Sequence, residues 1–186
     1  MKRICVFCGS AEGNDPAILD EARNLGRLLA ETGIGLVYGG AGIGVMGVLA
    51  DACLGAGGDV TGVIPRTLMR NEVAHRGLTK LIVVDDMHQR KALMADLSDA
   101  FIALPGGFGT FEEIFEMVTW RQIRIHSKPL VLVNTNGFYN GLHAFLTHAT
   151  NTGFIRDSNL ELLPMAEDSR KALSLLHLSL KISNFK

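Results

Sequence analysis

The sequence predicts an α/β fold in which a doubly wound parallel sheet forms a single domain. Short apolar runs rich in Val and Ile alternate with longer segments of helical periodicity, the pattern of βα units that carry parallel strands. A chain of 186 residues that is 47% hydrophobic can bury one sizeable core. Glycine-rich segments follow three of the expected strands, as in sheets that bind ligands beside the carboxyl ends of their strands.

Six strands and five helices are expected in alternating order. The strands are short apolar runs at 3–7, 35–38, 60–64, 81–84, 100–104 and 130–134. The helices are segments of 3.6-residue periodicity at 16–31, 43–56, 87–97, 110–124 and 139–150. No repeat, linker or low-complexity tract divides the chain. One domain is therefore expected over residues 1–186, with no element assigned in the tail after about residue 155.

Charge and hydropathy exclude several classes of partner. The formal net charge is -1 and Lys and Arg are spread along the chain, so no surface for nucleic acid or an anionic membrane is expected. The longest apolar stretches, such as 129–133, are far shorter than the roughly 20 residues that span a bilayer. The apolar run at 4–7 is too short for a signal peptide, so a cytoplasmic location is the default expectation.

Three cysteines, Cys5, Cys8 and Cys53, form no disulfide framework. We expect them to be buried and inert, because the spacing of Cys5 and Cys8 falls on a strand and its exit rather than at a helix start. His75 and His88 have no partner at metal-binding spacing, so no metal site is expected.

Glycine-rich loops follow the first, second and fifth expected strands, at 8–10, 39–44 and 105–110. In a parallel sheet these loops meet at one rim. Glycines there let the backbone approach a ligand closely, and the free N–H groups of the following helix favour an anion. The sequence therefore predicts a binding site for a small anionic ligand at this rim.

The segment 42–47 formally matches the dinucleotide-binding pattern G-x-G-x-x-G. It follows the second strand rather than the first, and the next strand ends at 63–66 without the acidic residue that would hold an adenosine ribose. NAD binding is therefore not favoured, and no phosphate-binding G-x-x-x-x-G-K-[ST] element is present. The alternative is that these glycines only tighten a turn and pack a helix on the sheet.

The segment 103–113 is more informative, because it places a strand, a glycine loop, a hydroxyl and two carboxylates at the start of one helix. Backbone amides of the loop can hold a phosphate while a carboxylate one turn along the helix reaches the sugar of a nucleotide. An alternative stays open. Thr110-x-x-Glu113 also fits a capping box, which satisfies unpaired amides at a helix start, and acidic residues there suit the helix dipole.

A third cluster, at 87–91, opens the helix before that strand. Helical spacing places Met87, Arg90, Lys91 and Met94 on one face, so the methionines can pack while Arg90 and Lys91 reach the rim. The alternative is a solvated basic pair.

At these residues the chain resembles the Lonely Guy family of cytokinin riboside 5′-monophosphate phosphoribohydrolases. The family motif is an Arg-Lys pair followed by P-G-G-x-G-T-x-E-E, present here as Arg90-Lys91 and 105–113. Shorter matches lie at 7–10, 38–40, 72–75, 119–120 and 125–129. One departure is Arg124, which stands where relatives commonly have a glycine that ends or kinks a helix.

The resemblance implies a Rossmann-like domain, usually a homodimer, that needs no cofactor and takes a small-molecule nucleotide. Carried over residue by residue, Arg90 and Glu113 would be catalytic. The substrate-binding residues would be Gly9, Ser10, Glu72, Met87, Lys91, Gly106, Gly107, Gly109, Thr110, Glu112 and Thr119. Some members carry a lysine decarboxylase label, which we set aside because neither Lys91 nor Lys128 stands out as a Schiff-base lysine.

The expected reaction is hydrolysis of the N-glycosidic bond of a purine nucleoside 5′-monophosphate. Positive charge develops on the sugar, so Glu113 would stabilise it and orient the attacking water, while Arg90, always protonated, would hold phosphate or sugar hydroxyls and fix Glu113. The sequence does not distinguish AMP from a cytokinin nucleotide. A non-catalytic nucleotide or cofactor carrier on the same fold is the alternative.

Overall fold

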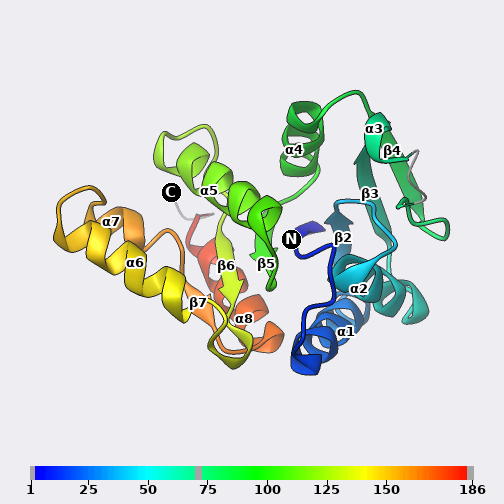
Figure 1. Ribbon diagram of the computed structural model, residues 1–186, viewed down its shortest axis with the longest axis horizontal. Helices are drawn as coiled ribbons and strands as arrows, with labels where there is room; N and C mark the ends of the chain where they lie inside the picture. The colour runs from blue at the N-terminus through cyan, green and yellow to red at the C-terminus, as the bar shows by residue number, and fades with distance from the viewer. Residues whose placement is uncertain (1–2, 70–72, 184–186) are drawn as a thin grey trace.

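Seven parallel strands form one sheet in the order β4-β3-β2-β1-β5-β6-β7 (Figure 1). The structure is a computed structural model that describes residues 3–69 and 73–183. The strands are β1 (Arg3–Phe7), β2 (Gly35–Tyr38), β3 (Val60–Pro65), β4 (Lys80–Val84), β5 (Ala100–Ala103), β6 (Leu130–Val133) and β7 (Met165–Ala166). The predicted doubly wound parallel sheet is confirmed.

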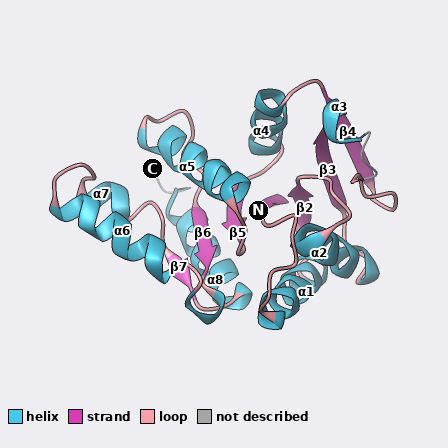
Figure 2. Cartoon of the chain, viewed as in Figure 1, coloured by secondary structure: helices cyan, strands magenta, loops and turns pink. Residues whose placement is uncertain are grey.

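Helices cover both faces of the sheet, with the strands between them (Figure 2). The helices are α1 (Pro16–Glu31), α2 (Gly44–Gly55), α3 (Arg66–Met69), α4 (Met87–Asp96), α5 (Phe108–Gln122), α6 (Asn140–Asn151), α7 (Asp157–Leu160) and α8 (Ser169–Ser183), with a 3₁₀ turn, η1 (Thr135–Gly137).

Side chains alternate between two cores along each central strand. In β1, Ile4 and Val6 pack with α1, α2 and α8, whereas Cys5 and Phe7 pack with α4, α5 and α6. Because both faces are covered, the central strands are buried throughout and have continuous apolar sequences.

The predicted strands and helices all form, with ends shifted by at most two residues. Five elements were not predicted: α3, the 3₁₀ turn η1, α7, the two-residue β7 and α8. The part of the tail that the structure describes, 156–183, is therefore folded. Its strand β7 pairs with β6, and Ala172 and Leu176 of α8 are fully buried in one core.

The strand order reverses at the centre of the sheet, because β1 lies between β2 and β5. The loops that leave β1 and β5 diverge there, which is where open α/β sheets bind ligands. At this point Gly9 N–H donates to Pro105 O at 3.2 Å. A Cβ on Gly9 would lie 3.3 Å from Gly106 Cα, so a residue without a side chain suits this close approach.

The loop after β2 joins the same rim, as predicted. Met46 and Val45 at the start of α2 donate their N–H groups to the carbonyls of Gly9 and Ala11. Gly44 has φ +60°, and a Cβ there would lie 2.3 Å from the Ser10 backbone. In the G-x-G-x-x-G segment, this glycine is required by packing of one loop on another.

Candidate active site

A cavity of about 400 Å³ lies where the three loops meet. It brings together eight of the predicted site residues: Gly9, Ser10, Met87, Arg90, Gly107, Gly109, Thr110 and Glu113. Sequence reasoning missed several other lining residues. Among these, Ile43 and Leu68 are apolar residues that no motif marked as site residues, whereas Phe108 lies within the glycine loop 107–110 that was expected to contact the substrate.

The first turn of α5 forms one wall. Its N-cap is Gly107, which makes no side-chain capping bond, and Phe111 N–H is the first to be paired, with Gly107 O. Over residues 3–69 and 73–183, the N–H groups of Phe108, Gly109 and Thr110 have no hydrogen-bond acceptor. These residues all line the cavity. Three amide donors at a helix start make this wall suited to an anion.

The capping-box interpretation is wrong. It requires Thr110 at the N-cap, but α5 begins at Phe108, so Thr110 is the third helical residue and Glu113 the sixth. The cause is the extended Gly107, which starts the helix two residues earlier than the hydroxyl suggested. Glu113 therefore caps nothing.

Helix α2 offers no equivalent site. Its N-cap is Ile43, and two of its first amides, from Val45 and Met46, already donate to carbonyls of the loop after β1. The capacity to bind an anion therefore lies at α5 rather than at the glycine-rich segment 42–47.

Arg90, on α4, is held rigidly from below the cavity. Its Nε donates to Val63 O and its Nη2 to Gly39 O, both at 3.2 Å, and Nη1 lies 3.7 Å from Met87 Sδ. A Cβ on Gly39 would lie 2.0 Å from Arg90 Nη2, so Gly39 makes room for the guanidinium. The remaining nitrogen, Nη1, also faces Glu113 and lies 4.0 Å from its Oε1.

Glu113 is a buried carboxyl with an altered pKa. Its side chain is 10% exposed. Burial raises the pKa of Glu113 to about 7, against the lowering effect of the Arg90 guanidinium. Beneath it, burial raises the pKa of the Cys8 thiol well above its usual range, so Cys8 is neutral and unreactive, as predicted.

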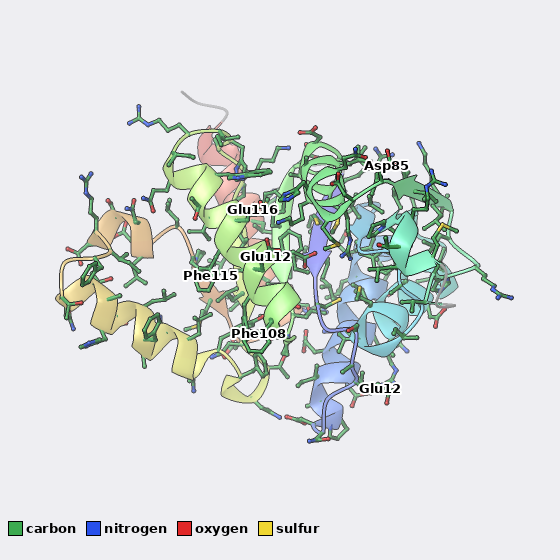
Figure 3. The ribbon with its side chains drawn as sticks, turned by 45° about the horizontal axis from the view of Figure 1, so that its top comes forward. Glu12, Asp85, Phe108, Glu112, Phe115 and Glu116 are labelled. Atoms are coloured by element: carbon green, nitrogen blue, oxygen red, sulfur yellow. The ribbon has the colours of Figure 1, made fainter. Side chains whose placement is uncertain are left out.

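Lys91 and Glu112 lie away from the cavity. Lys91 is buried between α4 and α5, where its ammonium contacts Glu112 and lies 3.1 Å from Glu116 Oε2. Figure 3 shows Glu112 and Glu116 on successive turns of α5, with Phe108 at the start of the same helix. Burial alone would lower the pKa of Lys91, but the two carboxylates together raise it, so Lys91 is a charged ammonium.

The remaining predicted residues are dispersed. Thr119 is exposed and lines a separate groove between α5 and α6, together with Leu146. Gly106 lies behind the cavity wall, where a Cβ would lie 2.1 Å from Thr110 Oγ1. Glu72 lies outside the described residues. The next residue, Val73, lines the cavity and accepts the N–H of Gly42.

Two features are absent from residues 3–69 and 73–183. No helix there is long and apolar enough to cross a membrane. No group of three or more His, Cys, Asp and Glu side chains is arranged to hold a metal ion.

The fold is shared with solved structures of low sequence identity. The molybdenum cofactor carrier protein of Chlamydomonas reinhardtii superposes with a TM-score of 0.73 at 23% identity, covering 97% of this chain and 98% of that one. The molybdenum cofactor binding protein of Rippkaea orientalis gives a TM-score of 0.72 at 23% identity, covering 95% and 96%. At this identity the likeness concerns the fold alone.

Sequence comparison is more specific. The family described as possible lysine decarboxylase matches residues 46–176. A cytokinin riboside 5′-monophosphate phosphoribohydrolase of Arabidopsis thaliana is 47% identical over 175 residues, covering 94% of this chain and 82% of the relative. The enzyme of that name from Rhodococcoides fascians is 48% identical over 174 residues, covering 93% and 88%. The chain belongs to the Lonely Guy family of cytokinin riboside 5′-monophosphate phosphoribohydrolases.

Proposed function

We propose that the protein hydrolyses the N-glycosidic bond of purine nucleoside 5′-monophosphates and releases free base and ribose 5-phosphate. The observation that carries this function is the pairing, in one cavity, of unpaired helix-start amides with the buried Arg90–Glu113 couple. An anion-binding wall and a carboxyl at the same cavity match a phosphorylated sugar whose anomeric carbon develops positive charge. Relatives at 47% and 48% identity carry the corresponding name.

The phosphate is assigned to the first turn of α5. Three amides and the helix dipole there provide directed, charge-assisted hydrogen bonds to an anion without a lysine or a metal ion. Binding energy from this remote group positions the sugar beside Glu113. Gly9, Ser10 and Met87 line the other sides of the cavity, so they are assigned to substrate contact as well.

The chemical step is assigned to Glu113 with Arg90. As the bond to the purine breaks, the anionic carboxylate stabilises the oxocarbenium-like sugar and orients the attacking water. Arg90 remains protonated, so it serves as a fixed donor rather than a proton source. Its two backbone anchors, Val63 and Gly39, leave one nitrogen free to face Glu113 and the substrate.

Decarboxylation of lysine is not supported by the placement of the lysines. Lys91 is locked between two carboxylates and Lys128 donates to Ala95 O at 2.7 Å. Neither lines the cavity, and a protonated amine held in ion pairs is a poor Schiff-base nucleophile.

The test is incubation with AMP, adenosine and isopentenyladenosine monophosphate, with chromatography of the released base. Cleavage of both nucleotides, with much slower cleavage of adenosine, is expected because the phosphate is the anchor. The ratio between the two nucleotides identifies the preferred substrate. Tight binding of AMP without release of adenine would instead establish a carrier, and equal turnover of AMP and adenosine would remove the phosphate assignment.

We also propose that the protein is a homodimer. On α5, the apolar side chains of Ile114 and Met117 are covered within the protomer. Other apolar side chains on α5, on α6 and in the turns after them are exposed, namely Phe115, Ile123, Ile125, Phe145 and Phe154. Exposed apolar side chains gathered on neighbouring elements are typical of a protein contact surface.

A further inference from the structure

The geometry points to Lys91 as a positioning residue that acts through Glu112 and Glu116 to hold α4 against α5, rather than as a ligand of the nucleotide. This inference rests on the proposed function and concerns how its two central side chains are kept in place. It differs from the expectation that Lys91 and Glu112 contact the substrate directly.

The Lys91 side chain lies outside the cavity. The Lys91 side chain is 7% exposed and does not line the cavity, so it presents no surface to a bound nucleotide. Its ammonium contacts Glu112 and lies 3.1 Å from Glu116. Glu112 and Glu116 are four residues apart on one face of α5, so a single cation bridges two successive turns.

Adjacent charged residues on α4 and on α5 point to different sides of their helices. Arg90 and Lys91 are adjacent on α4, and Glu112 and Glu113 are adjacent on α5. Neighbours on a helix project about 100° apart. One pair, Arg90 with Glu113, therefore faces the cavity, while Lys91 with Glu112 faces away from it. Two sets of ion pairs thus join the same two helices, and the bridge from Lys91 to Glu112 and Glu116 sets the rotation and spacing at which Arg90 meets Glu113.

Charged side chains from both helices act on the Glu113 carboxyl. The charged groups facing it are Arg90 and Lys91 from α4 and Glu112 and Glu116 from α5, beside the neutral thiols of Cys5 in β1 and Cys8 just after it. Arg90 and Lys91 lower the pKa of Glu113, whereas Glu112 and Glu116 raise it. Lys91 therefore affects Glu113 through space, without touching it or the substrate.

The experiment compares Lys91→Met, Lys91→Arg and Glu116→Gln with the parent, and uses Lys171→Met, an exposed lysine on α8, as the matched control. Kinetics with AMP give kcat, KM and the pH dependence of kcat/KM. A ¹³C-NMR titration of the Glu113 carboxyl reports its pKa without turnover.

For Lys91→Met we expect kcat to fall by about 10²-fold, the usual effect of a misplacement near 1 Å, with KM changed little. The pKa of Glu113 should rise in Lys91→Met and fall in Glu116→Gln. Lys91→Arg should recover most of kcat. A purely structural cation would not shift the titration of Glu113 in opposite directions in these two variants.

A direct substrate ligand would behave differently. Lys91→Met would then raise KM about tenfold or more while kcat stayed near the parental value, and this result would overturn the inference. If Lys91→Met fails to fold, Glu116→Gln still carries the test, because parental kcat and an unshifted Glu113 titration in that variant would refute a bridge between the helices through Glu116. Loss of the proposed function is distinguishable, since the parent itself would then release no adenine while the NMR titrations remain measurable.

Discussion

Glu113 is the residue on which the proposed chemistry depends most directly. Because the N-cap of α5 is Gly107, Glu113 has no capping role, and replacing it leaves the helix start intact. We expect Glu113→Gln to fold and bind AMP but to lose roughly 10²- to 10⁴-fold in turnover, the scale for a positioned acid or base. Glu31→Gln, at the exposed end of α1, is the control. Near-parental turnover in Glu113→Gln would remove the assignment.

The pH dependence follows from the pKa of Glu113, raised by burial to about 7. If the anion is the active form, kcat/KM should rise with pH through a midpoint near 7, and the rise should be absent in Glu113→Gln. A falling limb at that pH would assign Glu113 the role of proton donor instead.

The free energy of unfolding should fall over the same pH range in which kcat/KM rises. The folded protein holds the Glu113 proton up to about pH 7, whereas the unfolded chain releases it near the ordinary glutamate pKa of 4.5. Unfolding free energy contributed by this group is therefore lost as pH rises from 4.5 to 7, by about 3 kcal/mol at about 1.4 kcal/mol per unit. Denaturant melts at pH 5 and pH 8 should show this difference in the parent and not in Glu113→Gln.

Phe108 allows the anion-binding amides to be tested singly. It is the first residue of α5, where proline is tolerated, and the preceding Gly107 is extended, as a residue before proline prefers. Phe108→Pro removes one N–H, whereas Phe108→Ala keeps it and removes only the ring. Loss of the hydrogen bond from this N–H to the phosphate should raise KM for AMP in Phe108→Pro by about tenfold relative to Phe108→Ala, corresponding to roughly 1.5 kcal/mol. Equal KM values would place the phosphate elsewhere.

At the scale of the element, the end of α5 shows why a glycine suits the position that Arg124 occupies. Arg124 has φ +65° directly after the C-cap Ile123. Its N–H donates to Arg121 O, and Ile125 N–H donates to Trp120 O, which together form a Schellman motif. The relatives' glycine suits this left-handed position, and arginine occupies it at a cost.

We therefore expect Arg124→Gly to stabilise the protein by about 1 kcal/mol, because it relieves left-handed backbone strain. Arg124→Ala is the control, since it removes the long side chain but keeps the strain. A parental melting curve for Arg124→Gly would mean that the arginine side chain makes compensating contacts.

The elements that sequence patterns predicted are those whose burial repeats over several turns or along a whole strand. The unpredicted ones are short or lie in the tail. Helices α3 and α7 have four residues each and β7 has two, too few for a period to emerge. At the site, the glycine loops and Arg90 with Glu113 were predictable from motifs. The hydroxyl of Thr110 suggested a helix start two residues late, because an extended glycine leaves no side-chain signal. The inward turn of Lys91 depends on a pairing across two helices, which spacing along one helix cannot reveal.

For the whole molecule, the exposed apolar side chains on α5 and α6 predict self-association. Light scattering at micromolar concentration should give about twice the 20.1 kDa chain mass. An exposed apolar surface large enough for a stable dimer buries about 1,200–2,000 Å² in total. Phe145→Asp should shift the mass towards the monomer. Val83→Asp, an exposed residue on edge strand β4, should not. A parent that runs as a monomer would refute the proposal.

The central seam of the sheet also bears on how the protein acquires its activity. Strands β1 and β5 pair Ile4 with Ala100, so the neighbours at the middle of the sheet are almost a hundred residues apart in sequence. Arg90 is anchored by backbone from the half of the chain before this seam, and Glu113 belongs to the half after it. Closure of such long-range pairs is slow relative to local helix formation. During synthesis, the N-terminal half can therefore hold Arg90 in place before Glu113 is present. The catalytic pair is complete only when β5 and the strands after it have joined the sheet.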